Sequence, residues 1–269
     1  MPRILHSMKA TLCFLTALLA LTIMNPTATA KIQTEDVEYK SGDTVLEGFL
    51  AYDDGNAKPR PGVLLIHDWM GVGDYAKSRA RQLAELGYVA FAADIYGKGV
   101  RPAAPMEASA LAGKYKNDRA LYRERVKAGL DQLTQNKLVA PGEVAVIGYC
   151  FGGTGALELA RSGAALKGVV TFHGGLSNPT PADAKNIRCP VLVLHGADDP
   201  MVNAAEVAAF KSEMDKAHAK YEFIAYPGAV HAFTRPDAGN DNSKGAAYNE
   251  EADKKSWAEM KKFFGHIFG

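Results

Sequence analysis

The sequence predicts an α/β fold in which helices cover both faces of a mostly parallel central β-sheet. Short apolar runs of strand length alternate along the chain with longer amphipathic segments, as is typical of βαβ units. Most of these runs are continuously apolar, as expected for strands that are buried on both faces. Near the N-terminus, the turn Ser41-Gly42-Asp43 lies between two further strand-like segments, so we expect an N-terminal antiparallel hairpin at one edge of the sheet.

The composition is that of an ordinary globular protein. The chain has 269 residues, of which 47% are hydrophobic and 23% charged, and its formal net charge is +1. This length suffices for one large α/β domain or two small ones. Because there is no excess of basic residues to neutralise phosphates, the charge argues against nucleic acid as the main partner.

Residues 1–30 have the pattern of a secretory signal peptide. Arg3 and Lys9 give a positive start, residues 10–24 are apolar and uncharged, and Ala28-Thr29-Ala30 matches a cleavage site. We therefore expect cleavage after Ala30, a single mature domain over residues 31–269, and a periplasmic or secreted protein without membrane contact. The alternative is a transmembrane anchor, but the apolar run is short for a span of about 20 residues.

Strands are expected where short apolar runs lie between turn signals. The first two are rich in β-branched and aromatic residues, which favour strands, and the later ones are typical of buried strands. In chain order the expected strands cover residues 32–39, 45–52, 63–66, 88–93, 144–147, 168–172, 189–194 and 221–226.

Helices are expected between these strands, where apolar residues recur at helical spacing. In residues 75–86 the apolar positions lie on one side and leave three basic residues for solvent: Lys77, Arg79 and Arg81. The other expected helices cover residues 106–135 in one or two pieces, 154–162, 204–219 and 246–267. The stripe of large apolar residues in the last segment is typical of core packing.

The stretch Gly148-Tyr149-Cys150-Phe151-Gly152-Gly153 lies between an expected strand and an expected helix. Strand, tight turn and helix around G-x-C-x-G is the arrangement of a nucleophile elbow, with Cys in place of the usual Ser. The sharp turn needs small neighbours, which Gly148 and Gly152 supply. The Cys150 thiol would then project above the carboxyl edge of the sheet. On spacing alone, a buried structural Cys in an ordinary turn is an equal alternative.

Further polar residues follow the expected strands at the same edge, where ligands of such sheets bind. These residues are His67-Asp68, His173, His195 to Asp199, and His231. The chain order Cys150, Asp199, His231 is the nucleophile, acid and base order of the α/β-hydrolases. Asp198 is the rival acid, but it lies one residue earlier, so its side chain should point elsewhere.

With these residues the chain resembles the dienelactone hydrolase family over nearly all of the mature domain. Besides the elbow, the resemblance rests on four segments: His67-Asp68-Trp69-Met70-Gly71, Asp94-Ile95-Tyr96-Gly97, the acid loop, and His231-Ala232-Phe233-Thr234-Arg235. It implies an α/β-hydrolase fold and hydrolysis of an ester or lactone through a thiol ester. It places the triad on Cys150, Asp199 and His231, because the family acid fits Asp-x-x-Val, here Asp199 to Val202.

The roles then follow from the chemistry of a triad. His231 takes the thiol proton, Asp199 orients its imidazole, and the Cys150 thiolate attacks the carbonyl. The N–H of Phe151 and an N–H near Trp69 would hold the oxyanion, and loss of such a donor costs about 3 kcal/mol.

The resemblance also implies two residues that adjust the thiol or bind substrate. Asp68 stands where the family has a Glu that helps to control the Cys proton, and Arg235 matches a family Arg that could pair with Asp68 or bind a substrate carboxylate. The chain departs from the family elsewhere. Ala232 replaces a Ser, and a second substrate-binding Arg has no clear match among residues 106–116, so dienelactone itself is not implied as the substrate.

Two other classes of function compete with the hydrolase. An exported thiol is exposed to oxidation, so Cys150 could serve a non-catalytic redox or binding protein on a hydrolase scaffold; Asp199 and His231 argue against this, since a sensor needs no orienting acid. Three His and an Asp at one sheet edge could bind zinc in a metal-dependent hydrolase. No His-x-x-x-His or Cys-x-x-Cys spacing supports such a site.

His67, His173 and His195 are each expected instead to hydrogen-bond a local backbone group. Cys189 opens a strand that Cys150 does not share, roughly 15 Å away at about 3.3 Å per residue, too far for a disulfide. We expect it to be a small buried hydrophobe. The sequence therefore predicts a monomeric hydrolase of a small ester or lactone that needs no metal or other cofactor.

Overall fold

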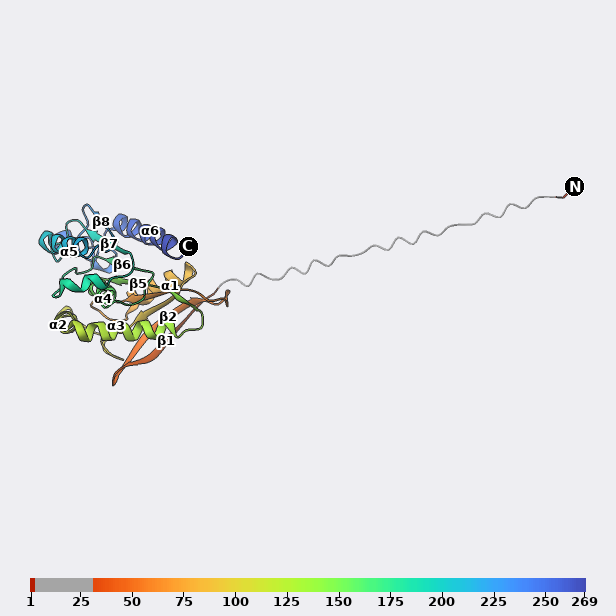
Figure 1. The fold of residues 1–269 in the computed structure, drawn as a ribbon, viewed down its shortest axis with the longest axis horizontal. Helices are drawn as coiled ribbons and strands as arrows, with labels where there is room; N and C mark the ends of the chain where they lie inside the picture. Colours follow the sequence, from red (N-terminus) through yellow and green to blue (C-terminus); the bar gives the residue numbers. More distant parts are fainter. Residues whose placement is uncertain (3–30) are drawn as a thin grey trace.

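The computed structural model describes residues 1–2 and 31–269, so the expected signal peptide lies outside the described residues apart from its first two. The described chain forms an eight-stranded sheet that runs from the β1–β2 hairpin to β8 (Figure 1). The strands are β1 (Ile32–Ser41), β2 (Thr44–Asp53), β3 (Arg60–Ile66), β4 (Val89–Ala93), β5 (Val139–Tyr149), β6 (Gly168–Phe172), β7 (Val191–Gly196) and β8 (Tyr221–Tyr226). The helices are α1 (Asp74–Glu85), α2 (Pro105–Asn117), α3 (Arg119–Thr134), α4 (Phe151–Arg161), α5 (Ala204–Lys216) and α6 (Glu250–Ile267), with short 3₁₀ turns η1 (Pro181–Asn186), η2 (Pro236–Ala238) and η3 (Asn242–Lys244).

The strand order is β1-β2-β4-β3-β5-β6-β7-β8. As the sequence predicted, β1 and β2 are antiparallel, and β2 also pairs antiparallel with β4. From β4 to β8 every pairing is parallel. Because parallel strands end at the same edge, the segments after β3, β5, β6 and β7 lie beside one another there.

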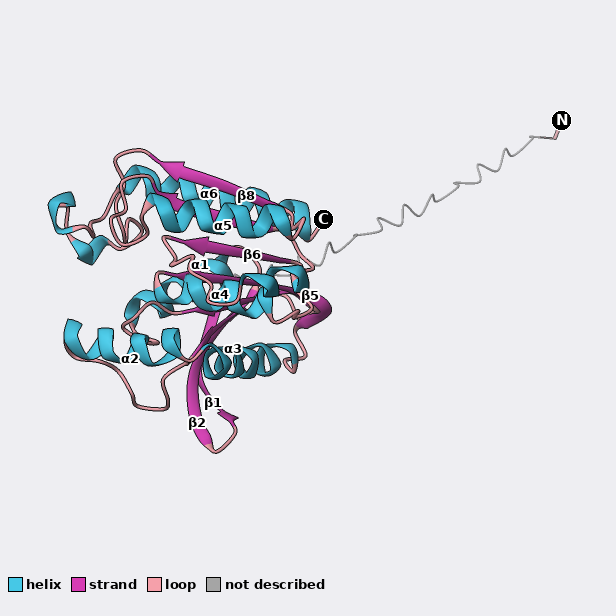
Figure 2. Ribbon diagram, turned by 60° about the vertical axis from the view of Figure 1, so that its left-hand side comes forward, coloured by secondary structure: helices cyan, strands magenta, loops and turns pink. Residues whose placement is uncertain are grey.

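Two apolar cores lie on the two faces of the sheet, beneath the helices that Figure 2 draws against the strands. Helices α2 to α5 cover one face, and α1 and α6 cover the other. Strand β3 shows the alternation between them: Leu64 and Ile66 belong to the first core, Val63 and Leu65 to the second. Since both faces are covered, the central strands carry apolar residues at successive positions.

Helix boundaries differ from the expectation where capping decides them. Residues 106–135 form two helices, because the Asp118 side chain accepts from the Leu121 N–H and starts α3. The final helix begins at Glu250 rather than at 246, since Ala246 pairs with His231 and Asn249 caps the helix.

The expectation that Arg79 faces solvent was wrong. Its guanidinium is buried, donates to the Thr234 carbonyl at 2.9 Å and pairs with Asp253 at 2.5 Å. It also lies over the rings of Tyr75 and Trp257. Helix α6 covers this side of α1, and periodicity within α1 cannot show a neighbour that comes from the far end of the chain.

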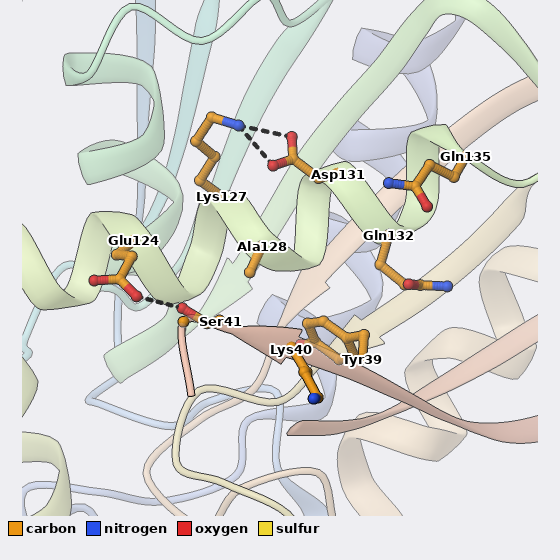
Figure 3. A pocket seen from close by; sticks show the side chains of 10 residues that line it. Tyr39, Lys40, Ser41, Glu124, Lys127, Ala128, Asp131, Gln132 and Gln135 are labelled. Atoms are coloured by element: carbon orange, nitrogen blue, oxygen red, sulfur yellow. Dashed lines mark hydrogen bonds and ion pairs between the residues drawn. The ribbon is translucent and has the colours of Figure 1, made fainter. Parts of the chain in front are cut away.

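A cavity of about 470 Å³ lies between the end of β1 and α3 (Figure 3). Several of its polar groups pair with one another: the Ser41 hydroxyl donates to Glu124 at 2.6 Å, and Lys127 donates to Asp131 at 2.6 and 2.8 Å. It contains none of the polar residues that follow the parallel strands. This cavity is therefore not the candidate active site.

Candidate active site

Cys150 lies at the tip of the sharp turn between β5 and α4, with a φ of 53° that few residues other than glycine adopt. Close backbone contacts fix the turn. A Cβ on Gly148 would lie 2.0 Å from the Gly152 carbonyl oxygen, and one on Gly152 would lie 2.1 Å from that of Ile66. The geometry therefore requires glycine at both positions, as the elbow motif predicted.

His231 bridges Cys150 and Asp199. Its Nε2 lies 3.0 Å from the Cys150 Sγ, and its Nδ1 lies 2.8 Å from the Asp199 Oδ2. The Asp199 carboxylate is buried and also accepts from the backbone N–H of Met201 at 2.8 Å. Asp198 points elsewhere, as expected, and accepts from the Gly228 N–H at 3.0 Å. The structure thus brings Cys150, Asp199 and His231 together.

The charges around His231 favour its protonated form. Burial alone would lower the pKa of His231, but negative charge on Cys150 and the contact with Asp199 outweigh burial and raise this pKa to about 10. A thiolate facing an imidazolium is the reactive form of a cysteine nucleophile. The arrangement therefore places an imidazole that binds a proton tightly beside the Cys150 sulfur.

Phe151 and Trp69 both line the cavity over Cys150. Phe151 is the first residue of α4, so its N–H has no acceptor within the helix. The peptide that follows Trp69 is held from two sides: its carbonyl accepts from the Tyr96 hydroxyl at 3.0 Å, and the Met70 N–H donates to Asp68 at 2.8 Å. The two turns expected to bind the oxyanion are therefore both fixed beside the thiol.

The cavity over Cys150 has a volume of about 430 Å³. Trp69, Phe151, Cys150 and His231 form one part of its wall. The remaining lining residues are Ser109, Ala112, Gly113, Lys116, Asn117, Gly175, Ser177, Met201, Val202 and Glu206. Lys116 is the one cationic residue among these described lining residues, and sequence reasoning did not single it out. It lies in the last turn of α2, within the segment 106–116 that has no Arg to match the family's second one, and its positive charge in that segment is the signal that could have found it.

Asp68 and Arg235 form an ion pair, and their side chains are only 3% and 15% exposed. The Arg235 Nε also donates to Asp237 at 2.9 Å. Burial would lower the pKa of Arg235, but the contacts with Asp237 and Asp68 raise it, so the guanidinium stays charged. Neither Asp68 nor Arg235 lines the cavity over Cys150. A substrate would reach Arg235 only if this pair opened.

The three remaining strand-end histidines differ from one another. His67 meets the expectation: its ring contacts the Asp68 carbonyl at 2.5 Å and accepts from the Ile95 N–H at 3.3 Å. For His173 and His195 the expectation was wrong. The Nε2 of His173 lies 2.7 Å from the Thr234 hydroxyl, a side chain that the fold brings in from another segment.

The Nδ1 of His195 has no hydrogen-bond partner among the described residues, and its ring packs against Phe223. No cluster of three or more His, Cys, Asp or Glu side chains in residues 31–269 could hold a metal ion. Cys189 is buried and unpaired, as expected, and burial raises its pKa to about 11.

The match to known proteins covers most of the chain. The model of the dienelactone hydrolase family matches residues 46–268. The chain is similar to the crystal structure of P91, a dienelactone hydrolase-like promiscuous phosphotriesterase from metagenomic libraries. The two share 41% identity with a TM-score of 0.85, and the match covers 88% of this chain and 99% of that one. The predicted α/β-hydrolase fold is therefore confirmed.

Curated relatives agree with the family match. A protein of Saccharolobus solfataricus that carries the provisional name carboxymethylenebutenolidase is 26% identical, over 87% of this chain and 98% of its own length. A protein of Bradyrhizobium sp, provisionally named 2-oxo-3-(5-oxofuran-2-ylidene)propanoate lactonase, is 30% identical over 64% of this chain and 73% of its own length. The chain therefore belongs to the dienelactone hydrolase family of the α/β-hydrolase superfamily and is a hydrolase of that family.

Proposed function

We propose that the protein hydrolyses a small ester or lactone through a thiol ester on Cys150, with His231 as acid and base and Asp199 as the orienting carboxylate. The observation that carries this proposal is the position of His231, 3.0 Å from the thiol and 2.8 Å from the Asp199 carboxylate. The provisional name of the Bradyrhizobium relative, a lactonase, supports the substrate class.

The reaction has two steps. The Cys150 thiolate attacks the carbonyl carbon, and the N–H groups of Phe151 and Trp69 stabilise the oxyanion. As the C–O bond breaks, the His231 imidazolium gives its proton to the leaving alkoxide. His231, now neutral, removes a proton from water, which attacks the thiol ester. The acid leaves, and thiolate and imidazolium are restored.

The direct test uses the thiol itself. Turnover of an activated aryl ester should stop when Cys150 is alkylated and should be insensitive to a chelator, because thiolate, imidazole and carboxylate suffice for the steps above. If turnover survived alkylation, Cys150 would instead be a binding or redox thiol. If a chelator removed activity, a metal-dependent hydrolysis would replace the proposal.

A phosphotriesterase side activity is a second candidate, favoured by the 41% identity to the promiscuous phosphotriesterase P91. With the oxyanion donors proposed above, a thiolate can attack a phosphoryl centre as it attacks a carbonyl, since both develop negative charge on an oxygen. We expect slow hydrolysis of an aryl phosphotriester that is also lost in Cys150→Ala. Hydrolysis that persists in this variant would assign the activity to another site.

We also propose export, with cleavage after Ala30 and a periplasmic or secreted mature protein. The support is the sequence of residues 1–30, with its basic start, its apolar stretch and its Ala-x-Ala site. None of the helices in the described part of the chain is both long and apolar enough to cross a membrane.

N-terminal sequencing of the exported protein should give a chain that begins at or near Lys31, because cleavage follows small residues at the Ala-x-Ala site. A mature chain that kept residues 10–24 would indicate an anchor instead. Fractionation of the producing cells is the control, since a chain found only in the cytoplasm would contradict export.

The Arg235→Ala substitution is expected to reduce kcat/KM more for an anionic ester than for a neutral aryl ester. An anionic substrate that opens the Asp68–Arg235 pair would gain a charge-assisted hydrogen bond to Arg235, and losing it costs about 2 kcal/mol. The measurement compares one anionic and one neutral ester in both proteins.

Lys116→Ala is the control for the source of positive charge, because Lys116 lines the cavity and Arg235 does not. Arg235 would have no role in substrate binding if Lys116→Ala lowered kcat/KM only for the anionic ester while Arg235→Ala lowered kcat/KM equally for both esters.

A further inference from the structure

A buried polar cluster lies under the turn that carries His231. Thr234, three residues after His231, is fully buried. Its hydroxyl lies 2.7 Å from the Nε2 of His173 and 2.6 Å from the hydroxyl of Tyr75. The Thr234 carbonyl accepts from Arg79 at 2.9 Å. The hydroxyl and the carbonyl of this residue are therefore both held by other elements.

The cluster ties the turn to elements that lie on both sides of it. Tyr75 and Arg79 come from α1, and the Arg79 Nε donates to the Tyr75 hydroxyl at 3.3 Å. Arg79 in turn pairs with Asp253 of α6. His173 follows β6, the neighbour of β5, and β5 ends one residue before Cys150. A displacement of Thr234 would break its contacts to α1 and to His173 after β6.

His173 also touches the proposed base directly. Its ring packs edge-on against the ring of His231, with 5.2 Å between centroids. Burial, and then the charge of His231, lower the pKa of His173 well below its usual range, so His173 stays neutral beside an imidazolium. The other charged groups that face His173 are Arg79 and Arg235, and those that face His231 are Cys150, Asp199 and His195.

The turn needs this support because its backbone is strained. Ala232, the residue after His231, has a φ of 57°, which a residue with a Cβ seldom adopts. Strained positions persist only where the surroundings determine them. Upstream, the His231 N–H donates to the Gly245 carbonyl at 3.2 Å and the His231 carbonyl accepts from Ala247 at 3.0 Å. Downstream, the Thr234 contacts supply the second anchor.

We propose that Thr234, clamped between Tyr75 and His173, is a positioning residue that holds the His231 imidazole against the Cys150 thiol. This inference rests on the proposed thiol mechanism and adds to it a residue that touches neither substrate nor thiol. The hydroxyl acts by fixing the far side of the strained turn. Without it, the turn can relax and the 3.0 Å contact between His231 and Cys150 lengthens.

The test measures the rate of Cys150 alkylation by iodoacetamide against pH, which reports thiolate formation without any substrate. Thr234→Val keeps the shape and removes the hydroxyl. In Thr234→Val we expect alkylation at pH 7 to slow about tenfold and the midpoint of the rate curve to move to higher pH. We also expect kcat for a neutral aryl ester to fall about tenfold with KM unchanged, as for loss of a hydrogen bond that positions the base. Thr234→Ser should restore the alkylation curve and kcat.

A second pair of variants guards against loss of the fold in Thr234→Val. Tyr75→Phe removes a hydroxyl that contacts Thr234, whereas Tyr226→Phe removes a buried hydroxyl that has no partner among the described residues. Tyr75→Phe should slow alkylation at least threefold relative to Tyr226→Phe, at the same thermal midpoint, since only the first hydroxyl supports the turn. Equal alkylation curves in Thr234→Val, Tyr75→Phe and the parent protein would overturn the proposal.

His231→Gln separates this inference from the mechanism on which it rests. If His231→Gln leaves the alkylation curve unchanged, the thiol and imidazole are not coupled, and the proposed function fails together with the role of Thr234. If His231→Gln slows alkylation and Thr234→Val does not, the thiol mechanism stands and only the positioning role is lost.

Discussion

Cys150→Ala is expected to lower kcat/KM for an activated aryl ester by at least about 10⁴-fold, because the nucleophile of a triad cannot be replaced by its neighbours. The fold should survive, since the elbow is held by the close backbone approach at Gly148 and Gly152 rather than by the thiol. Steady-state kinetics, with thermal unfolding to check the fold, measure both effects. Cys150→Ser should keep weak activity, because the hydroxyl is a poorer nucleophile in the same place.

Cys189→Ala is the matched control, because Cys150 and Cys189 are the two free thiols of residues 31–269. Cys189 packs in the apolar core, so this variant should lose a little stability, on the order of 1 kcal/mol, and keep its turnover. Activity that survives in Cys150→Ala, or disappears in Cys189→Ala, would contradict the assignment of the nucleophile.

Asp199→Asn should lower kcat on the order of 10³-fold or more, because an amide favours the wrong tautomer of the His231 imidazole and withdraws support from the imidazolium. Asp198→Asn should change kcat little, since that carboxylate binds the Gly228 N–H and not His231. The two variants differ by one position in the same loop, so they control for each other. The reverse ranking would show that Asp198 is the acid.

The pH profile gives a second readout of the same variant. The contact with Asp199 helps to raise the pKa of His231 to about 10. Activity that needs the imidazolium is therefore present below this pH and is lost as the pH rises through it. The Asp199→Asn substitution removes one of the contacts that raise the pKa of His231, so activity should begin to fall at a lower pH. An unchanged alkaline limb in Asp199→Asn would indicate that another group controls it.

The fold and the three central site residues could be predicted from the sequence because local signals carry them. The apolar runs fix the parallel strands, since a strand buried on both faces has no polar position. Glycines at 148 and 152 mark the elbow, because any side chain there would collide with backbone. Chain order then indicated Asp199 and His231. Asp198 was set aside because its side chain should point elsewhere and because the family acid fits Asp-x-x-Val, here Asp199 to Val202.

What the sequence could not supply lies in contacts between segments far apart in the chain. The spacing of apolar residues in α1 predicts that Arg79 lies on the surface. It is buried because α6 and the turn after His231 pack over it, where it pairs with Asp253 and donates to the Thr234 carbonyl. Lys116 faces the cavity, whereas Arg235 is held by Asp68 outside its lining.

The amino-acid sequence by itself determined the sheet and the elbow, because periodicity and glycine requirements act over a few residues. The resemblance to the family then gave Cys150, Asp199 and His231 as the candidate triad. The tertiary structure alone decided which charges pair, which cation reaches the cavity, and what supports the strained turn at Ala232. Those features include contacts between residues that are far apart in the sequence: Thr234 and His173 are 61 positions apart, and Asp68 and Arg235 are 167 apart. Local spacing carries no information about such distances.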